Sequence, residues 1–222
     1  MGFFKILNEK EGFGGGSGAR YIVPLDALGV PAEVKRAYLK PSEGDVVIDV
    51  GAHCGFYTLH ASRLVGDQGM ILAFEPHPDN YKRLLTNLHL NKMKNVKTFS
   101  MALGDRDGQT KLYICPYSDG HSTFFRTKGY LTVKIGKIDT VVNKLGLKKI
   151  DLIKIDAEGD ELAVLKGAIE TIKKYKPKIT VGAYHFPNEI DKIEEWLKTN
   201  DSSYIIETVN NRYLQATGDG FV

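Results

Sequence analysis

The sequence predicts an α/β domain built on a mostly parallel sheet. Short apolar runs rich in β-branched residues alternate with stretches of helical periodicity, beginning with 46–50 and then 56–64. Such alternation is typical of a parallel sheet covered on both faces. The chain then closes with two strand-like segments joined by Asn210 and Asn211, residues that tolerate positive φ and suit a hairpin turn. We therefore expect a seven-stranded, Rossmann-like sheet that ends in an antiparallel hairpin.

Length and composition fit one sizeable domain of an ordinary globular protein. The chain has 222 residues, of which 42% are hydrophobic and 26% charged, and a net charge of +3 that by itself identifies no partner. The two cysteines form no CxxC pair, which favours a reduced setting without structural zinc. No apolar run approaches the roughly 20 residues of a membrane span, and the start of the chain does not resemble a signal peptide. We expect a cytoplasmic monomer or homodimer that does not bind membranes.

The expected elements follow in order along the chain. Residues 1–40 form an N-terminal extension, in which the glycine-rich stretch 12–18 is a linker or a mobile lid and 31–39 is a short helix. The main domain covers 41–222, and its insertion at 106–137 is a candidate substrate edge. The expected strands are 46–50, 70–74, 96–101, 111–114, 131–135, 150–155, 178–183, 204–208 and 212–216. The expected helices are 56–64, 79–90, 139–145 with Asp139 as its cap, a single helix ending near Lys174, and 187–198.

Polar residues gather at the expected ends of the parallel strands. They are Asp49, Glu75, Asp105, Asp156 with Glu158, and His185. Ligands of open parallel sheets bind beyond these carboxyl ends, so the pattern predicts one shared site. A single acidic residue there is more often a helix cap, but five strand ends in register are harder to explain that way.

The first of these turns indicates which class of ligand is bound. It reads Asp49-Val50-Gly51-Ala52-His53-Cys54-Gly55, with the acid first and without the GxGxxG spacing of dinucleotide folds. A carboxylate at this point would repel a diphosphate and would suit an ammonium or sulfonium group. Glu75, at the end of the second strand, can accept hydrogen bonds from both ribose hydroxyls. These features favour S-adenosylmethionine over NAD.

The motifs resemble those of the FkbM-type family of class I S-adenosylmethionine-dependent methyltransferases. Three segments carry the resemblance: the turn from Asp49 to Thr58, Phe74-Glu75-Pro76, and the 151–168 stretch that contains Asp156-Ala157-Glu158-Gly159. The resemblance covers about residues 45–186. The chain departs from the family pattern at His53, where Asn is frequent, and at Ala183, where an acid usually precedes His185.

The resemblance implies roles for individual residues. It places Asp49, Gly51 and Gly55 at the methionine end of the cofactor and Glu75 at its ribose. The remaining cofactor-site residues that it suggests are His53, Phe56, Thr58, Pro76, Met101, Ala102, Leu103 and Asp156, with Met101, Ala102 and Leu103 beside the adenine. Phe56 also fits a core position, and the Thr58 hydroxyl could serve only the backbone.

Methyl transfer to a hydroxyl requires removal of a proton, and two mechanisms fit the sequence. In the favoured one, His185 is the general base, because its ordinary pKa lies near neutrality. In the other, Asp156, Glu158 and His185 hold a divalent metal, an arrangement similar to that of catechol O-methyltransferases. Lys154 lies on the same strand face as Asp156 and is predicted to be an ion-pair partner. In the insertion, His121, Ser122 and Thr123 are explained equally well as acceptor contacts or as a polar loop.

The favoured function is therefore O-methylation of a small molecule or sugar. An RNA methyltransferase is the alternative, suggested by the polar segment 87–92 and nearby lysines, although lysines after a helix are usually solvated. An NAD-linked oxidoreductase and a non-catalytic binding module are the remaining hypotheses.

Overall fold

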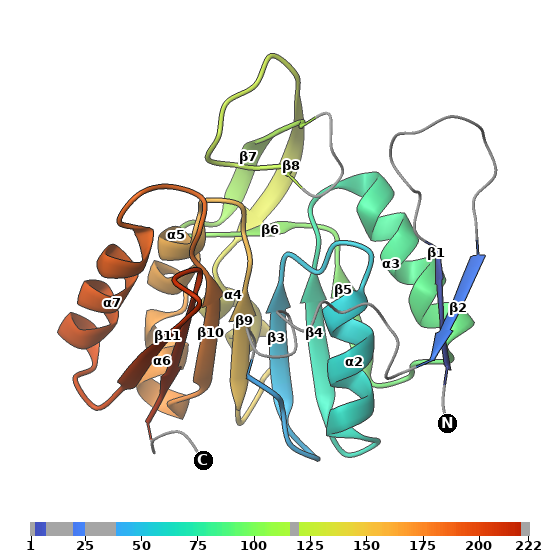
Figure 1. The fold of residues 1–222 in the computed structure, drawn as a ribbon, viewed down its shortest axis with the longest axis horizontal. Coiled ribbons are helices and arrows are strands. Elements are labelled where there is room, and N and C mark those ends of the chain that lie inside the picture. The colour runs from blue at the N-terminus through green and yellow to red at the C-terminus, as the bar shows by residue number, and fades with distance from the viewer. Residues whose placement is uncertain (1–2, 8–19, 25–38, 116–119, 219–222) are drawn as a thin grey trace.

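The central element is a seven-stranded sheet in the order β11-β12-β10-β9-β3-β4-β5. The computed structural model describes residues 3–7, 20–24, 39–115 and 120–218 (Figure 1). Five neighbouring strands are parallel, whereas β12 runs antiparallel to both β10 and β11. This confirms the predicted mostly parallel sheet with its closing hairpin. The strands are β3 (Val46–Val50), β4 (Met70–Phe74), β5 (Val96–Phe99), β9 (Leu152–Ile155), β10 (Lys178–Gly182), β11 (Ile205–Val209) and β12 (Tyr213–Thr217).

Helices cover both faces of this sheet, so each face has its own core. Alternation along β3 sends Val47 to one core and Val46 and Ile48 to the other. The first core contains side chains of α2 and α3, and the second contains those of the later helices. The helices are α2 (Phe56–Val65), α3 (Pro78–Leu90), α4 (Ile138–Lys144), α5 (Glu161–Lys166), α6 (Ile169–Tyr175) and α7 (Glu189–Asn200).

The insertion at 106–137 forms a separate three-stranded sheet together with the short strand that precedes it, in the order β6-β8-β7. It consists of β6 (Ala102–Leu103), β7 (Gly108–Tyr113) and β8 (Tyr130–Gly136), and it stands above the carboxyl end of the main sheet (Figure 1). The predicted strand 96–101 was therefore wrong at its end. β5 stops at Phe99, and the chain then leaves β4 to pair with β8.

Two predictions about helices were wrong. The single helix ending near Lys174 is two helices, α5 and α6, with Gly167 and Ala168 between them. Gly167 packs so closely that a Cβ there would stand 1.9 Å from the Gly104 carbonyl oxygen. Asp139 does not cap α4, whose N-cap is Lys137. Its carboxylate instead accepts the backbone N–H groups of Glu170 (3.1 Å) and Thr171 (2.8 Å), in the first turn of α6. The pattern predicted a capping side chain but could not show which helix it serves.

Near the N-terminus, β1 (Phe3–Leu7) pairs antiparallel with β2 (Arg20–Pro24) and lies beside α3. The predicted glycine-rich linker at 12–18 and residues 31–38 of the predicted short helix lie outside the described residues. Among the described residues, no helix is both long enough and apolar enough to span a membrane.

Candidate active site

A cavity of about 470 Å³ lies at the carboxyl ends of the central strands. The strand order reverses between β3 and β9, which is where open α/β sheets bind their ligands. The insertion contributes part of the wall through Leu112, His121 and Thr123. The cavity therefore combines residues of the main sheet with residues of the small one.

The structure brings most of the predicted site residues to this cavity. Those that line it are Gly51, His53, Glu75, Pro76, Met101, Ala102, Leu103, Asp156 and Glu158. The predicted residues that do not line it are Asp49, Gly55, Phe56, Thr58 and His185. Asp105 lies apart from it, where it is exposed and pairs with Arg106. Other lining residues had no predicted site role. Phe74 carried a signal, because it belongs to the Phe74-Glu75-Pro76 motif, and Asn80 carried one as a polar residue in the first turn of a predicted helix. The rest are Val50, Leu112, Gly120, Ala157 and Tyr184.

The two glycines of the first turn permit close packing. Gly51 has φ +73°, and a Cβ there would stand 1.9 Å from the carbonyl oxygen of Asp156. Gly55 has φ +95°, and a Cβ there would stand 2.7 Å from Leu84 of α3. A side chain at either position would push the turn away from its neighbours. The two glycines therefore allow the turn to pack directly against Asp156, at the end of β9, and against α3.

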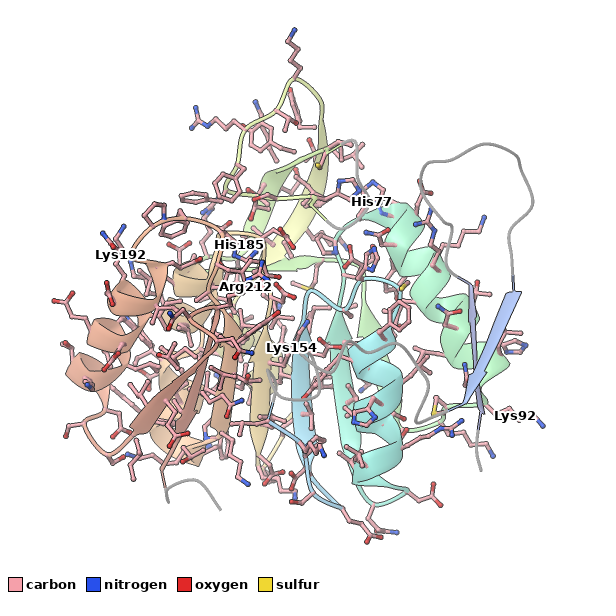
Figure 2. All side chains as sticks on the ribbon, in the orientation of Figure 1. His77, Lys92, Lys154, His185, Lys192 and Arg212 are labelled. Carbon is pink, nitrogen blue, oxygen red and sulfur yellow. The ribbon has the colours of Figure 1, made fainter. Side chains whose placement is uncertain are left out.

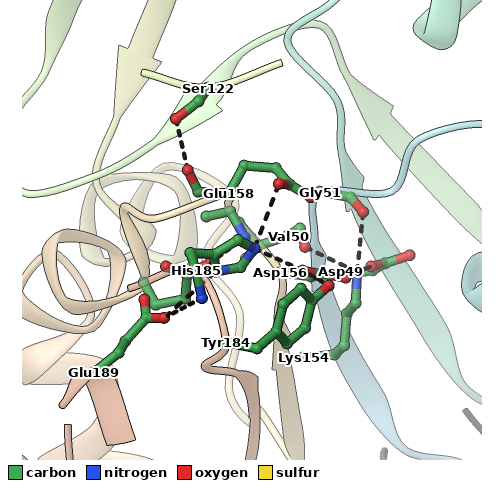
Figure 3. Close-up of polar contacts among 12 residues, drawn as sticks. Asp49, Val50, Gly51, Ser122, Lys154, Asp156, Glu158, Tyr184, His185 and Glu189 are labelled. Atoms are coloured by element: carbon green, nitrogen blue, oxygen red, sulfur yellow. Dashed lines mark hydrogen bonds and ion pairs between the residues drawn. The ribbon is translucent and has the colours of Figure 1, made fainter. Parts of the chain in front are cut away.

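Asp49 lies beneath this turn in a buried ion pair. Its side chain has no exposed surface, and its Oδ1 lies 3.1 Å from Nζ of Lys154. Thr58 donates its hydroxyl to the Asp49 Oδ2 at 2.5 Å. Lys154 also donates to the carbonyl oxygens of Val50 (3.0 Å) and Gly51 (2.9 Å) (Figure 3). The predicted ion-pair role of Lys154 is confirmed.

Burial by itself would lower the pKa of Lys154, but the negative charges of Asp49 and Asp156 outweigh burial and raise it. Lys154 is therefore charged at neutral pH and ties Asp49 to the backbone of the turn. The Asp49 carboxylate lies behind the cavity wall, so it would act on a ligand indirectly, through the shape of this turn.

Glu75 is held in place by backbone donors. Its carboxylate accepts the N–H of His53 at 2.8 Å and the N–H of His77 at 2.9 Å. Burial raises the Glu75 pKa to about 7, although these two hydrogen bonds oppose the rise. The cavity wall thus carries a carboxylate of fixed orientation.

A second group of acids surrounds His185; Figure 2 shows where His185 lies in the molecule. We call Asp156, Glu158, Glu161, His185 and Glu189 the His185 cluster. His185 Nε2 lies 3.4 Å from Glu158 Oε2 and 4.0 Å from Asp156 Oδ1. Its Nδ1 lies 3.3 Å from Glu161 Oε1 and 3.5 Å from Glu189 Oε2. Glu161 and Glu189 were not predicted, because only the placement of α5 and α7 brings them to His185.

The cluster changes the expected chemistry of His185. Burial lowers the pKa of His185, but its contacts with Glu158 and Glu189 and the charge of Glu161 outweigh burial and raise the pKa to about 10. Burial also raises the Glu161 pKa to about 8. At neutral pH, His185 is therefore an imidazolium. It can accept a proton only after losing the one it holds.

Glu158 occupies a backbone conformation that glycine or asparagine adopts more readily. Its φ is +53°, and that of Gly159 is +102°. Ser122 of the insertion donates its hydroxyl to the Glu158 carbonyl oxygen at 2.6 Å (Figure 3), and Phe124 and Phe125 lie against Gly159. The insertion thus holds this turn in place, and backbone strain of this kind is often retained where a side chain is functional.

Tyr184 forms the rim between β10 and the cavity. Its hydroxyl donates to Asp156 Oδ1 at 3.2 Å, and its side chain remains partly exposed. The Arg212 guanidinium lies 5.1 Å from the centre of its ring. An aromatic surface therefore stands beside the acidic end of the cavity.

Residues 49–205 match the methyltransferase FkbM domain family. The methyltransferase sdnD of Sordaria araneosa is 33% identical over 157 residues, with 56% of this chain and 60% of sdnD covered. The hexuronic acid methyltransferase AglP of Haloferax volcanii is 29% identical over 131 residues, covering 59% and 53% of the two chains. The 2-O-methyltransferase NoeI of Sinorhizobium fredii is 24% identical over 174 residues, covering 68% of each.

Among solved structures, the methyltransferase FkbM of Methylobacillus flagellatus superposes with a TM-score of 0.62 at 20% identity, covering 87% of this chain and 48% of that one. This likeness shows the fold. The chain spans only about half to three fifths of the length of the first curated relatives that it matches. With 157 residues of the family domain matched and its sheet order in place, the chain belongs to the FkbM family of methyltransferases.

Proposed function

We propose that this chain transfers a methyl group from S-adenosylmethionine to a hydroxyl group of a small molecule or sugar. The observation that carries the proposal is the placement of Glu75 and the apolar segment Met101 to Leu103 on one cavity at the switch point. A fixed carboxylate suits the two hydroxyls of a ribose, and an apolar wall beside it suits an adenine.

The cofactor half of the proposal assigns a role to each wall of the cavity. Glu75 accepts the ribose hydroxyls, and Met101, Ala102 and Leu103 contact the adenine. Gly51 and His53 pass beside the methionine portion through the turn that Asp49 and Lys154 stabilise. Gly55, Phe56 and Thr58 support this turn from outside the cavity, because they begin α2.

The acceptor half of the proposal involves Asp156, Glu158 and His185. S-adenosylmethionine, when bound, would supply the methyl group, with its carbon–sulfur bond exchanged for a bond to the acceptor oxygen, and a carboxylate at the cavity wall would take the hydroxyl proton. Asp156 and Glu158 face the cavity, whereas His185 is protonated and stands behind them. The raised pKa of His185 therefore weighs against its predicted role as the general base. It favours a role in which the positive charge of His185 balances the surrounding carboxylates.

The names of two relatives support the hydroxyl and sugar part of the proposal. AglP is a hexuronic acid methyltransferase and NoeI is a 2-O-methyltransferase. Family membership supports methyl transfer against the oxidoreductase hypothesis. The transfer assay described below distinguishes a sugar acceptor from RNA.

Calorimetry with S-adenosylhomocysteine tests the cofactor half. We expect the wild type to bind one molecule per chain, and Glu75→Ala to weaken binding at least tenfold. Glu195→Ala, an exposed change on α7, is the control and should bind normally. Equal binding by wild type and Glu75→Ala, or none by the wild type, would contradict the proposal.

Transfer assays with labelled S-adenosylmethionine test the acceptor half. A panel of sugars, uronic acids, amines and transfer RNA is offered to the wild type and to Glu158→Gln. We expect label on a hydroxyl of a sugar or uronic acid, and at least a tenfold slower rate in the variant. Label on an amine or on RNA alone would refute O-methylation of a small molecule.

A further inference from the structure

We infer that the His185 cluster binds a divalent cation between His185 Nε2 and the carboxylates of Asp156 and Glu158, and that the imidazolium releases its Nε2 proton to solvent when the ion binds. Binding of the ion follows from the cluster itself, whereas any part that the ion plays in methyl transfer rests on the function proposed above. Three properties of the cluster point to a cation: its charge, the spacing of its donor atoms and the way in which His185 is held.

The cluster contains more negative than positive groups. Four carboxyl groups meet one imidazole, and three acids still face this one base when Glu161, which burial keeps protonated, is left out. The side chains of Glu161, Glu189 and His185 are only 0%, 2% and 5% exposed. Among the described residues, the two nearby cations have their printed contacts outside the cluster, although the charges of Lys154 and Asp156 also act on each other: Lys154 pairs with Asp49, and Arg212 lies over the Tyr184 ring. Burying several carboxylates together is costly unless a positive charge compensates them.

The donor atoms are spaced as ligands of one ion rather than as hydrogen-bonded pairs. Both ring nitrogens of His185, Oε2 of Glu161 and Oε1 of Glu189 are buried without a hydrogen-bond partner among the described residues. Two ligands about 2.1 Å from a metal are separated by about 3.0 Å at right angles and about 4.2 Å when opposite. The Nε2 distances to Glu158 and Asp156, 3.4 and 4.0 Å, fall in that interval.

The cluster is also compact enough to surround a single ion. One donor atom from each of Asp156, Glu161 and His185 lies within 4.8 Å of the other two. Glu161 is therefore close enough to act on the same ion, either directly or through the imidazole.

The remaining acids hold His185 with one nitrogen toward the cavity. Glu161 and Glu189 both approach Nδ1. They are themselves fixed, because Glu161 accepts the N–H of Ala157 and Glu189 accepts the backbone N–H of His185, both at 2.8 Å. A histidine that ligates a metal usually donates its other ring N–H to a carboxylate. This arrangement leaves Nε2 directed to Asp156 and Glu158.

The cavity side of the cluster is open to a ligand. Asp156 and Glu158 line the cavity, and their side chains are 22% and 28% exposed. Two carboxylate oxygens and one imidazole nitrogen, with no thiolate, suit a hard divalent ion such as Mg²⁺ or Mn²⁺. An ion here would polarise an oxygen of the acceptor and favour loss of its proton.

Titration of Mn²⁺ alone into the full chain, followed by calorimetry and electron paramagnetic resonance, tests the inference. We expect one site per chain in the wild type. Asp156→Asn and His185→Gln should weaken binding at least 100-fold, and Glu161→Gln about 10- to 100-fold, as for acids that orient a ligating histidine. Glu195→Gln, an exposed carboxylate on the same helix as Glu189, is the matched control and should bind as the wild type does.

A second variant and a second ligand keep the outcomes distinct. Glu158→Gln changes a partly exposed side chain, so of these variants it should disturb folding least. Mn²⁺ should raise the melting temperature of the wild type but not of this variant. Absence of a Mn²⁺ site in the wild type, or equal binding by all variants, overturns the inference. If the wild type binds S-adenosylhomocysteine but not Mn²⁺, the proposed function stands and the inference fails. If the wild type binds Mn²⁺ but not S-adenosylhomocysteine, only the cofactor proposal fails.

Discussion

Replacing Lys154 by Met should destabilise the protein strongly. The substitution leaves the Asp49 carboxylate fully buried with its hydrogen bond from Thr58, and it removes the donor to the carbonyl oxygens of Val50 and Gly51. Breaking a buried ion pair on one side costs about 3–5 kcal/mol, or about 6–20 °C in melting temperature for a chain of this size. Urea denaturation monitored by circular dichroism measures the loss.

Lys149→Met is the matched control. Lys149 also pairs with an aspartate, Asp151, at 3.0 Å and donates to a carbonyl oxygen, but its side chain is 52% exposed. Its loss should cost about 0–1 kcal/mol. Adding Asp49→Asn to Lys154→Met should recover part of the lost stability, because no unpaired charge then stays buried. Equal losses for the two lysine variants would refute the buried-pair reasoning.

Three other substitutions test other parts of the site. Gly51→Ala should cost about 3 kcal/mol, because its Cβ would meet the Asp156 carbonyl oxygen and its φ is positive; urea denaturation measures it. Glu75 has a pKa of about 7 against an ordinary 4.5, so the native state keeps a proton that the unfolded chain loses. Its contribution to stability should fall by about 3 kcal/mol from pH 4.5 to 7 and then level off, and Glu75→Gln should remove that slope in denaturation series. Ser122→Ala should speed amide exchange in residues 120–125, because it removes the donor to the Glu158 carbonyl oxygen.

Each of these has a contrary result, and two have matched control variants. Gly129→Ala adds a methyl group where nothing lies within 4 Å and should change little; a Gly51→Ala loss as small as this would contradict the close approach. If Glu75→Gln has the same pH slope as the wild type, the carboxyl does not hold a proton as described. Ser202→Ala, at an exposed turn, should leave amide exchange in residues 120–125 unchanged. Equal exchange in both serine variants would show that the Ser122 hydrogen bond does not hold the Glu158 turn in place.

The sequence predicted the main sheet well because its signals are local. Apolar runs and turn residues identified β3 and β4 at both ends, and Asn210 with Asn211 identified the closing hairpin, where both have positive φ. The strand ends placed Glu75 and Asp156 at one cavity, since parallel strands bring their carboxyl ends to one edge.

The sequence could not predict contacts that depend on how distant elements pack. The sequence predicted an ion pair for Lys154 but did not identify Asp49, on the neighbouring strand, as its partner. His185 looked like a base of ordinary pKa, but Glu161 and Glu189 approach it from two helices. Each contact joins segments separated by loops, so no local pattern encodes it.

The left-handed conformations of His53 and Glu158, at φ +50° and +53°, affect how this protein could be engineered. At a non-glycine residue, each left-handed conformation costs about 1–2 kcal/mol relative to glycine, so glycine at either position would increase thermal stability. A selection for heat resistance alone would therefore accept Glu158→Gly early and discard a carboxylate at the cavity wall. Selection schemes for this protein need turnover as a second criterion, because two of its left-handed non-glycine residues line the cavity, whereas Lys92 and Lys176 offer the same backbone relief away from it.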